Sequence, residues 1–351
     1  MGKLRVLVVE DSLTIRRRLV EVLQEAAEFE VVAEAADGRQ AVELCLQHRP
    51  DAVTMDMVLP EMSGLAATEY IMAHCPTPIL VVSSSFNRGE VWKTYDALAA
   101  GAVDVIDKPS GKEAPGVWES RFVSALRIVS RVRVITHIRA RLAVQHSVSP
   151  ALASLSPRAG PLEVMGLGAS TGGPNALGVV LSALPKSFSV PVLAVMHISA
   201  PFEVSFAEWL SARVSRPVIH PKGGELVESL AGRVVLAPAD RHLVVRAGRI
   251  RLTDDPERHS CRPSVDLLFE SLAAEYGRAA AGCLLTGMGR DGALGLLSLQ
   301  RAGAPTIAQD EATSVVYGMP REAALLGAAD RILPLDQIGG AIVALAGVGK
   351  A

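Results

Sequence analysis

The amino-acid sequence predicts an α/β protein with two domains, each built around a mainly parallel sheet. Short valine-rich apolar segments alternate with segments of helical periodicity over residues 3–109, and the alternation resumes from Leu162. Such alternation is typical of βα units and a parallel sheet. The residues between are rich in arginine and end in a Ser- and Pro-rich sequence. We therefore expect a first domain over 3–122, a basic helix and linker over 123–160, and a second domain over 161–349.

Composition excludes several classes of protein. With 49% hydrophobic and 21% charged residues, the 351-residue chain is globular rather than disordered. A net charge of −2 gives no sign of a nucleic-acid partner. No apolar stretch is long enough to span a bilayer, no signal peptide opens the chain, and the four cysteines form no CxxC pair. We expect a cytoplasmic protein that is not embedded in a membrane and has no structural zinc site.

The elements of the first domain follow one another in a regular order. SLTIRRRLVEVLQEA, residues 12–26, has apolar residues at helical spacing, and GRQAVELCLQ, residues 38–47, reads as a second helix. Five apolar runs read as strands and predict a five-stranded parallel sheet: LRVLVVE, FEVVAEA, DAVTMD, PILVVSS and VDVIDKP.

Charged and polar residues gather where these predicted strands end. Glu10 and Asp11 close the first strand, Asp56 the third and Ser83 the fourth, and Lys108 follows the fifth. Functional groups in a parallel sheet collect at the carboxyl ends of its strands, so we expect these five side chains in one crevice. Crowded carboxylates need a neutralising cation, and oxygen ligands suit Mg²⁺. A lone aspartate after a strand is commonly a turn residue, but five such residues at the right ends predict a site.

These residues give the first domain its resemblance to the response-regulator receiver family, which has a flavodoxin-like fold. The resemblance implies phosphoryl transfer from a histidine kinase onto Asp56 in TMDMVLPEMSG, with Mg²⁺ held by Glu10, Asp11 and Asp56. It gives Ser83 in VVSSS and Lys108 in DKP supporting roles at the phosphorylated site.

The second domain resumes the same pattern with different motifs. Two segments are predicted to be helices: NALGVVLSAL and FEVSFAEWLSARV. LEVMGLG, VPVLAVMH, RVVLAPAD, LVVRAGRIRL and AGCLLTGMG read as strands.

The first of these strands runs into GLGASTGGP, residues 166–174, which allows two interpretations. The dinucleotide fingerprint G-x-G-x-x-G is broken, because its third glycine position is Thr171, and no Walker lysine follows. G-A-S-T-G instead matches the nucleophile-elbow pattern G-x-S-x-G, with Ser170 at the exposed turn. The motif favours a serine nucleophile, and a nucleotide-dependent oxidoreductase is the alternative.

A serine nucleophile needs a base and an orienting acid. His197 ends the second strand, and Asp291 follows a later strand, so both reach the edge of Ser170 if the sheet is parallel. The chain order Ser, His, Asp differs from that of α/β-hydrolases. Backbone amides near Thr171 and Gly172, or near Met288, are candidate oxyanion donors. The remaining candidate histidines are less well placed, and His242, at the start of a strand, is expected to face away: His220, His242 and His259.

The second domain resembles the chemotaxis protein-glutamate methylesterase (CheB) family. The resemblance rests on GASTGGP, MHISAPFEVSFAEWL, LAPADRHLVV, RPSVDLLF, LLTGMGRDGALGL and QDEATSVVYGMPREA. It implies a seven-stranded, mainly parallel doubly wound sheet and the triad Ser170, His197 and Asp291. It also implies a serine esterase, with no cofactor for its chemistry, that acts on methylated glutamates of methyl-accepting chemoreceptors and deamidates some glutamines.

Other readings of the chain stay open or are disfavoured. A receiver joined to a DNA-binding domain would regulate transcription, but no helix-turn-helix signal follows residue 160. The arginines of residues 123–160 form either a solvated helix face or a surface for an acidic partner.

Overall fold

The computed structural model describes residues 2–84, 88–109, 111, 113–132, 134, 161–198 and 200–347. The chain divides into two compact units, Met1–Ser147 and Val148–Ala351, and each is described by itself. Most of the predicted linker, including Arg133, Arg139, Arg141 and Arg158, lies outside the described residues.

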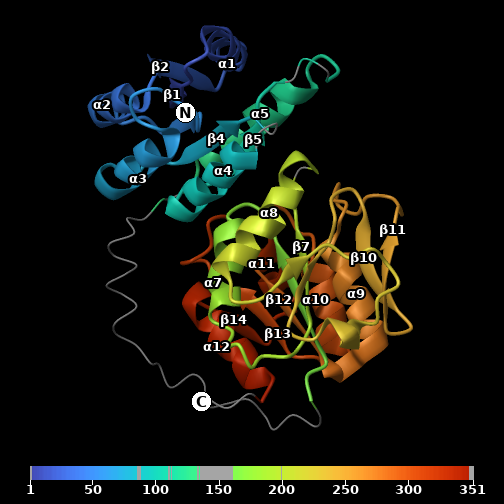
Figure 1. Ribbon diagram of the computed structural model, residues 1–351. Coiled ribbons are helices and arrows are strands. Elements are labelled where there is room, and N and C mark those ends of the chain that lie inside the picture. The colour runs from blue at the N-terminus through green and yellow to red at the C-terminus, as the bar shows by residue number, and fades with distance from the viewer. Residues whose placement is uncertain are drawn as a thin grey trace. The chain divides into compact units, whose positions relative to one another are not determined.

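The first unit is built on a five-stranded parallel sheet with the strand order β2-β1-β3-β4-β5, which confirms the predicted sheet (Figure 1). Contacts between helices place α1 with α5, and α3 with both α2 and α4, so the sheet is covered on both faces. The strands are β1 (Leu4–Val9), β2 (Phe29–Ala35), β3 (Ala52–Met55), β4 (Ile79–Ser83) and β5 (Asp104–Asp107). The helices are α1 (Leu13–Glu25), α2 (Gly38–His48), α3 (Gly64–His74), α4 (Arg88–Ala100) and α5 (Val117–Val129).

Helix α5 continues past the expected domain boundary at residue 122. Trp118, Phe122 and Leu126 recur at helical spacing and are buried, so the helix packs against the first unit over most of its length. Arg127 donates two hydrogen bonds from Nε and Nη2 to Glu28 Oε1, at 2.9 and 2.6 Å. At least this arginine of the basic segment pairs within its own unit.

The second unit contains a seven-stranded sheet in the order β14-β13-β12-β6-β7-β9-β8, and its recorded pairings are all parallel. The sheet strands are β6 (Val164–Ala169), β7 (Val192–Met196), β8 (Val218–Ile219), β9 (Val234–Leu236), β12 (Ala280–Leu284), β13 (Thr306–Gln309) and β14 (Arg331–Leu333). Strands β6, β7 and β12 are buried throughout, as expected for a parallel sheet covered on both faces.

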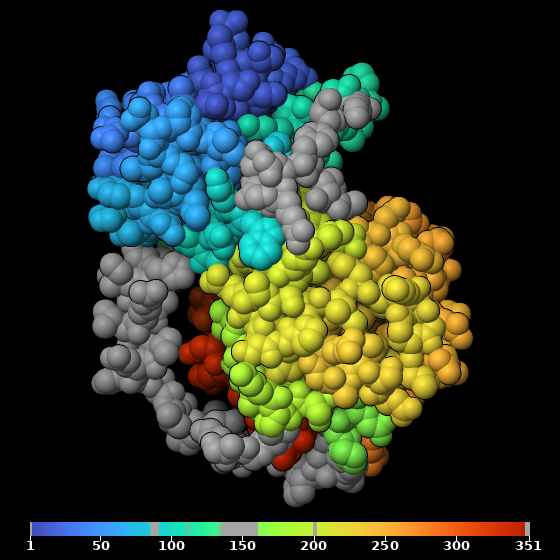
Figure 2. All heavy atoms as spheres, viewed as in Figure 1, coloured from blue at the N-terminus to red at the C-terminus, as the bar shows by residue number. Residues whose placement is uncertain are grey.

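Helices cover both faces of this sheet. Contacts join α7 to α8 and α12, and join α10 to α9 and α11. In the view of Figure 2, the segment of residues 202–253, coloured yellow to orange, forms much of the visible surface of the unit. The helices are α7 (Gly173–Ser182), α8 (Ala200–Arg213), η2 (Val227–Leu230), α9 (Val265–Tyr276), η3 (Gly277–Ala279), α10 (Ala293–Arg301), α11 (Met319–Leu325) and α12 (Leu335–Leu345).

The run LVVRAGRIRL, expected as one strand, is a hairpin outside the main sheet. Strands β10 (His242–Arg246) and β11 (Arg249–Thr253) pair antiparallel and form a separate two-stranded sheet. The turn between them is Ala247–Gly248, and both residues have positive φ, 50° and 67°. Two such residues are typical of the tight turn that suits the twist of a hairpin.

No helix in the described part of the chain has both the length and the apolar character needed to cross a lipid bilayer.

Close packing between β6 and α9 requires a glycine at position 168. A Cβ added to Gly168 would lie 2.3 Å from Val265 Cγ1 and 3.0 Å from Leu284 Cδ1. Val265 is the first residue of α9, so this contact sets how closely the start of the helix approaches the sheet.

We expect Gly168→Ala to lower the free energy of unfolding of the second unit by about 1–3 kcal/mol, because the added methyl group overpacks this contact. Urea unfolding of the full chain measures the change. Gly178→Ala in α7 is the matched control, since the nearest atom to its Cβ is 4.0 Å away. The control should retain or slightly raise stability, and equal stability of the two variants would contradict the packing argument.

Candidate functional site

Three neighbouring strands of the second sheet deliver the predicted nucleophile, base and acid to the same edge. Strand β6 lies between β12 and β7, and all three run parallel. Ser170 directly follows β6, His197 directly follows β7, and Asp291 lies in the loop between β12 and α10. The expected convergence of these segments on one edge is present in the structure.

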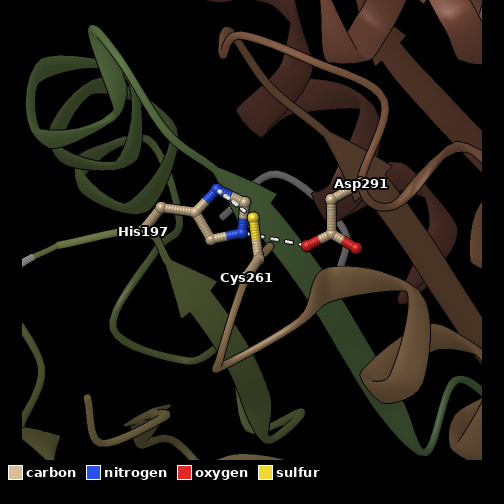
Figure 3. Close-up of side chains that lie close together, drawn as sticks. All are labelled: His197, Cys261 and Asp291. Carbon is tan, nitrogen blue, oxygen red and sulfur yellow. Dashed lines mark hydrogen bonds and ion pairs between the residues drawn. The ribbon is translucent and has the colours of Figure 1, made fainter. Parts of the chain in front are cut away.

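His197 and Asp291 are in direct contact. His197 Nε2 lies 2.9 Å from Asp291 Oδ2, and the two side chains are 17% and 2% exposed. The other ring nitrogen, Nδ1, lies 3.9 Å from the sulfur of Cys261. Figure 3 shows the ring with one nitrogen joined to the Asp291 carboxylate and the other to Cys261. Nδ1 is therefore the nitrogen that Asp291 leaves available.

Asp291 is held at the N-terminus of α9. Its Oδ1 accepts hydrogen bonds from Ser264 Oγ at 2.7 Å and from the Asp266 amide at 3.1 Å. Its Oδ2 accepts one from the Val265 amide at 2.7 Å. The first amides of a helix carry partial positive charge and have no partner within the helix, so they favour an anion. This arrangement keeps the buried carboxylate charged and oriented toward His197.

The two side chains shift each other's pKa in opposite directions. Burial acts to lower the pKa of His197, but the hydrogen bond that its ring donates to Asp291 and the adjacent Cys261 outweigh burial and raise the pKa to about 9. Burial acts to raise the pKa of Asp291, but His197 and the donors at the start of α9 hold it below its usual range. The resting pair therefore favours an imidazolium and a carboxylate at neutral pH.

Ser170 follows β6, whose neighbour β7 runs into His197, and its hydrogen bonds to the described residues are made by its backbone. Its amide donates to Thr286 O at 3.0 Å, and its carbonyl accepts from Gly173 N at 2.7 Å, which holds the turn into α7. A Cβ on Gly287 would lie 2.7 Å from Ser170 Cβ, so the loop after β12 packs directly on the serine. Among the described residues, no hydrogen bond joins the Ser170 hydroxyl to His197.

The candidate oxyanion donors lie on either side of Ser170. Gly172 has φ of 77° and is the N-cap residue of α7. Met288 is 54% exposed on the loop after β12. Thr171 is buried, and its carbonyl accepts a hydrogen bond from Thr286 Oγ1 at 3.0 Å. The described backbone provides no carbonyl acceptor for the amides of Gly172 and Met288.

Sequence reasoning did not find three residues around the pair: Ser264, Cys261 and His242. Ser264 caps α9, and a serine before the apolar run VDLLFESL was the signal that could have located this helix start. His242 was expected to face away, but it is fully buried, and its Nδ1 accepts the Ser264 amide at 3.1 Å. His242 therefore holds Ser264 in place, and the Ser264 hydroxyl donates to Asp291. No sequence signal placed Cys261 beside His197.

In the first unit the predicted acidic site is assembled. Ligand oxygens of Glu10, Asp11 and Asp56 all lie within 4.8 Å of one another. Lys108 Nζ lies 2.9 Å from both Glu10 Oε2 and Asp56 Oδ2. Ser83 Oγ accepts a hydrogen bond from Thr94 Oγ1 at 3.0 Å, and the Ser83 carbonyl accepts the Lys108 amide.

The electrostatics of this cluster suit a hard cation. Burial, and next the Asp56 carboxylate, raise the pKa of Glu10 to about 7 against the opposing effect of Lys108. Burial also raises the pKa of Asp56. Glu10 Oε2 and Asp56 Oδ2 are buried, and among the described residues they have no hydrogen-bond partner apart from their ion pairs with Lys108. These oxygens fit a divalent cation, which would relieve the repulsion between the carboxylates.

Comparison with known proteins identifies both units. Residues 165–342 match the family description "CheB methylesterase", and residues 6–114 match "Response regulator receiver domain". The chain is 44% identical over 335 residues to "Protein-glutamate methylesterase/protein-glutamine glutaminase 2" of Anaeromyxobacter dehalogenans, covering 95% of each chain. It is 41% identical over 348 residues to "Protein-glutamate methylesterase/protein-glutamine glutaminase" of Nitrosospira multiformis, covering 97% of each.

A solved structure agrees with the second unit. The CheB methylesterase catalytic domain of Thermotoga maritima is 33% identical, with a TM-score of 0.50, and the match covers 52% of this chain and 98% of that one. With a matching catalytic-domain fold and relatives aligned over nearly their whole length, the chain belongs to the CheB methylesterase family, in its form with an N-terminal response-regulator receiver domain.

Proposed function

We propose that this protein is a phosphorylation-regulated serine esterase for chemosensory adaptation. It hydrolyses glutamate methyl esters on chemoreceptors to glutamate and methanol, and it deamidates receptor glutamines. The observation that carries the proposal is the His197–Asp291 pair, 2.9 Å apart, at the sheet edge where Ser170 follows β6. The names of the two relatives support the same pair of reactions.

In this proposal Ser170 attacks the γ-carbonyl of the ester while His197 accepts its proton. Asp291 occupies Nε2, so Nδ1 is the nitrogen that takes the proton and later returns it to the leaving methanol. The serine and the ring must close on each other for this step, and catalytic hydrogen bonds often form only when substrate is bound. Water then hydrolyses the acyl-enzyme and frees Ser170.

The developing oxyanion needs donors near Ser170. Amides of Gly172 and Met288 support this role, since they lie on the two segments next to the serine and the described backbone provides them no acceptor. Thr171, between Ser170 and Gly172, is a third candidate.

The receiver over residues 3–122 controls this reaction, and the esterase domain spans 161–349, with the basic helix and linker of 123–160 between them. A histidine kinase of the chemosensory pathway donates the phosphoryl group to Asp56. Glu10, Asp11 and Asp56 would hold Mg²⁺, which supplies charge neutralisation when bound. Lys108 holds the added negative charge, and Ser83 lies on the neighbouring strand end. Four free cysteines fit a cytoplasmic location.

The identity of the nucleophile is tested first. We expect Ser170→Ala to reduce methanol release from methylated receptor by about 10⁴-fold, because the attacking oxygen is lost. Circular dichroism checks that the variant is folded. Cys261→Ser is the matched comparison, because the Cys261 sulfur lies 3.9 Å from Nδ1 and is a second candidate nucleophile there. Cys261→Ser should still hydrolyse the ester; the reverse pattern would make Cys261 the nucleophile.

The pH dependence of the reaction follows from the His197 pKa. A base must be neutral, and a pKa raised to about 9 keeps His197 protonated at neutral pH, so kcat/KM should rise with pH along a limb above 6.5. In Asp291→Asn the imidazolium loses its anionic partner, so the His197 ring, followed by NMR, should titrate at lower pH. Ser170→Ala supplies the blank for alkaline ester hydrolysis. Suppose instead that kcat/KM rises with an apparent pKa at or below 6.5 and that the His197 titration is unchanged in Asp291→Asn. That result would rule out a His197 pKa raised by Asp291.

Phosphorylation is tested at Asp56. Asp56→Asn should abolish labelling by a small-molecule phosphodonor with Mg²⁺, because an amide is a poor nucleophile, while basal ester hydrolysis persists. In the wild-type protein the same phosphodonor should raise the rate by roughly 5–150-fold, the usual range for coupling between sites. Labelling and activation of the variant would place the phosphoacceptor at another residue.

A further inference from the structure

Cys261 lies next to His197, on the side of the ring away from Asp291. Its sulfur lies 3.9 Å from Nδ1, the ring nitrogen that Asp291 does not engage. One ligand atom from each of His197, Cys261 and Asp291 lies within 4.8 Å of the other two (Figure 3). Cys261 is partly exposed, whereas the other three cysteines are buried, so it is the thiol that a solute reaches first.

We propose that His197 Nδ1 and Cys261 Sγ bind a soft divalent transition-metal ion such as Zn²⁺, and that the bound ion inhibits the esterase. Zn–S and Zn–N bonds of about 2.3 and 2.0–2.1 Å at a tetrahedral angle place the two ligand atoms about 3.6 Å apart. The observed separation of 3.9 Å needs only a small side-chain adjustment to meet that value. Thiolate and imidazole are ligands that such ions select.

Asp291 completes the site without coordinating the ion. Both of its oxygens already accept hydrogen bonds, Oδ1 from Ser264 and Asp266 and Oδ2 from Val265 and His197. Through Oδ2 it holds the Nε2 proton, so the lone pair of neutral His197 is placed on Nδ1. A histidine ligand whose second nitrogen donates to a carboxylate is a recurring arrangement at zinc sites, where the carboxylate orients the ring.

Binding of the metal ion releases protons from its two ligands. The ion displaces the thiol proton of Cys261 and, where the ring is protonated, the Nδ1 proton of His197, and both go to solvent. The Nδ1 lone pair then forms the bond to the metal and is no longer available to accept a proton from Ser170. This inhibitory step rests on the proposed role of His197 as base, whereas the binding itself does not.

The test must distinguish this site from two other groups of metal-ligand side chains in the chain. The carboxylates of Glu10, Asp11 and Asp56 also suit divalent ions but prefer hard ones, so excess Mg²⁺ occupies them during the test. Cys45 and Cys75 have sulfurs 3.8 Å apart but are buried in the first unit. Cys75→Ser is therefore the matched thiol control.

The binding test uses the full chain with Co²⁺ as a spectroscopic substitute for Zn²⁺, in excess Mg²⁺. We expect a near-ultraviolet thiolate-to-cobalt absorption band that Cys261→Ser and His197→Ala both remove and that Cys75→Ser retains. In the wild-type protein, Zn²⁺ should also slow the reaction of one thiol with an alkylating reagent, a measurement that requires no variant. A band that persists in Cys261→Ser, or no protection by Zn²⁺, overturns the proposed site.

The inhibition test measures methanol release against free Zn²⁺, each variant relative to its own metal-free rate. Half-inhibition should need at least about tenfold more Zn²⁺ in Cys261→Ser than in Cys75→Ser or the wild-type protein, because the thiolate is the softer ligand. A chelator should restore the rate. Equal sensitivity of the variants, or activation by Zn²⁺, contradicts the inhibitory proposal. Cobalt binding in a protein with no esterase activity would leave the metal site standing and reject the proposed function.

Discussion

The second unit depends on one buried anion at the start of a helix. Asp291 accepts hydrogen bonds from the first two backbone amides of α9 and from the hydroxyl of its N-cap residue, Ser264. The same carboxylate lies 2.9 Å from His197 Nε2 and orients the ring. A buried carboxylate is costly unless its oxygens are hydrogen-bonded, and the helix terminus supplies three of the donors to Asp291, beside the His197 ring. The helix start, the loop after β12 and the end of β7 are thereby tied to one point.

The packing beneath this point keeps the helix start in place. Gly168 lets Val265 approach β6, and the Val265 amide donates to Asp291. His242, in a hairpin outside the main sheet, accepts the Ser264 amide and so adds a further layer of support. The position of one carboxylate oxygen thus depends on a glycine, a helix cap and a hairpin from three separate parts of the sequence. Such support holds a reactive ring in one orientation.

The two units place charge at the ends of parallel strands in opposite ways. In the first, three carboxylates crowd together, and Lys108 neutralises only part of their charge, so the cluster still favours a cation. In the second, the Asp291 carboxylate is already satisfied by a helix terminus and a histidine, and the nearby buried Asp266 carboxylate is paired with His259 and Arg258. The chemistry proposed there depends on His197 Nδ1, the ring nitrogen that Asp291 does not engage. Cys261 lies 3.9 Å from that nitrogen and Ser170 follows the neighbouring strand, so catalysis and metal binding would compete for the ring.

The sequence by itself determined the fold class and the residues at the strand ends. Alternating strand and helix signals imply parallel sheets, and parallel neighbours end at one edge, which was enough to bring together Glu10, Asp11 and Asp56, and to bring His197 to Asp291. Only the tertiary structure decided which strands are neighbours, with β6 between β12 and β7. It alone decided that α9 presents its N-terminus to Asp291, that LVVRAGRIRL forms a hairpin, and which ring nitrogen faces Cys261. These contacts join residues far apart in the chain, and packing sets them, so no local pattern of residues encodes them.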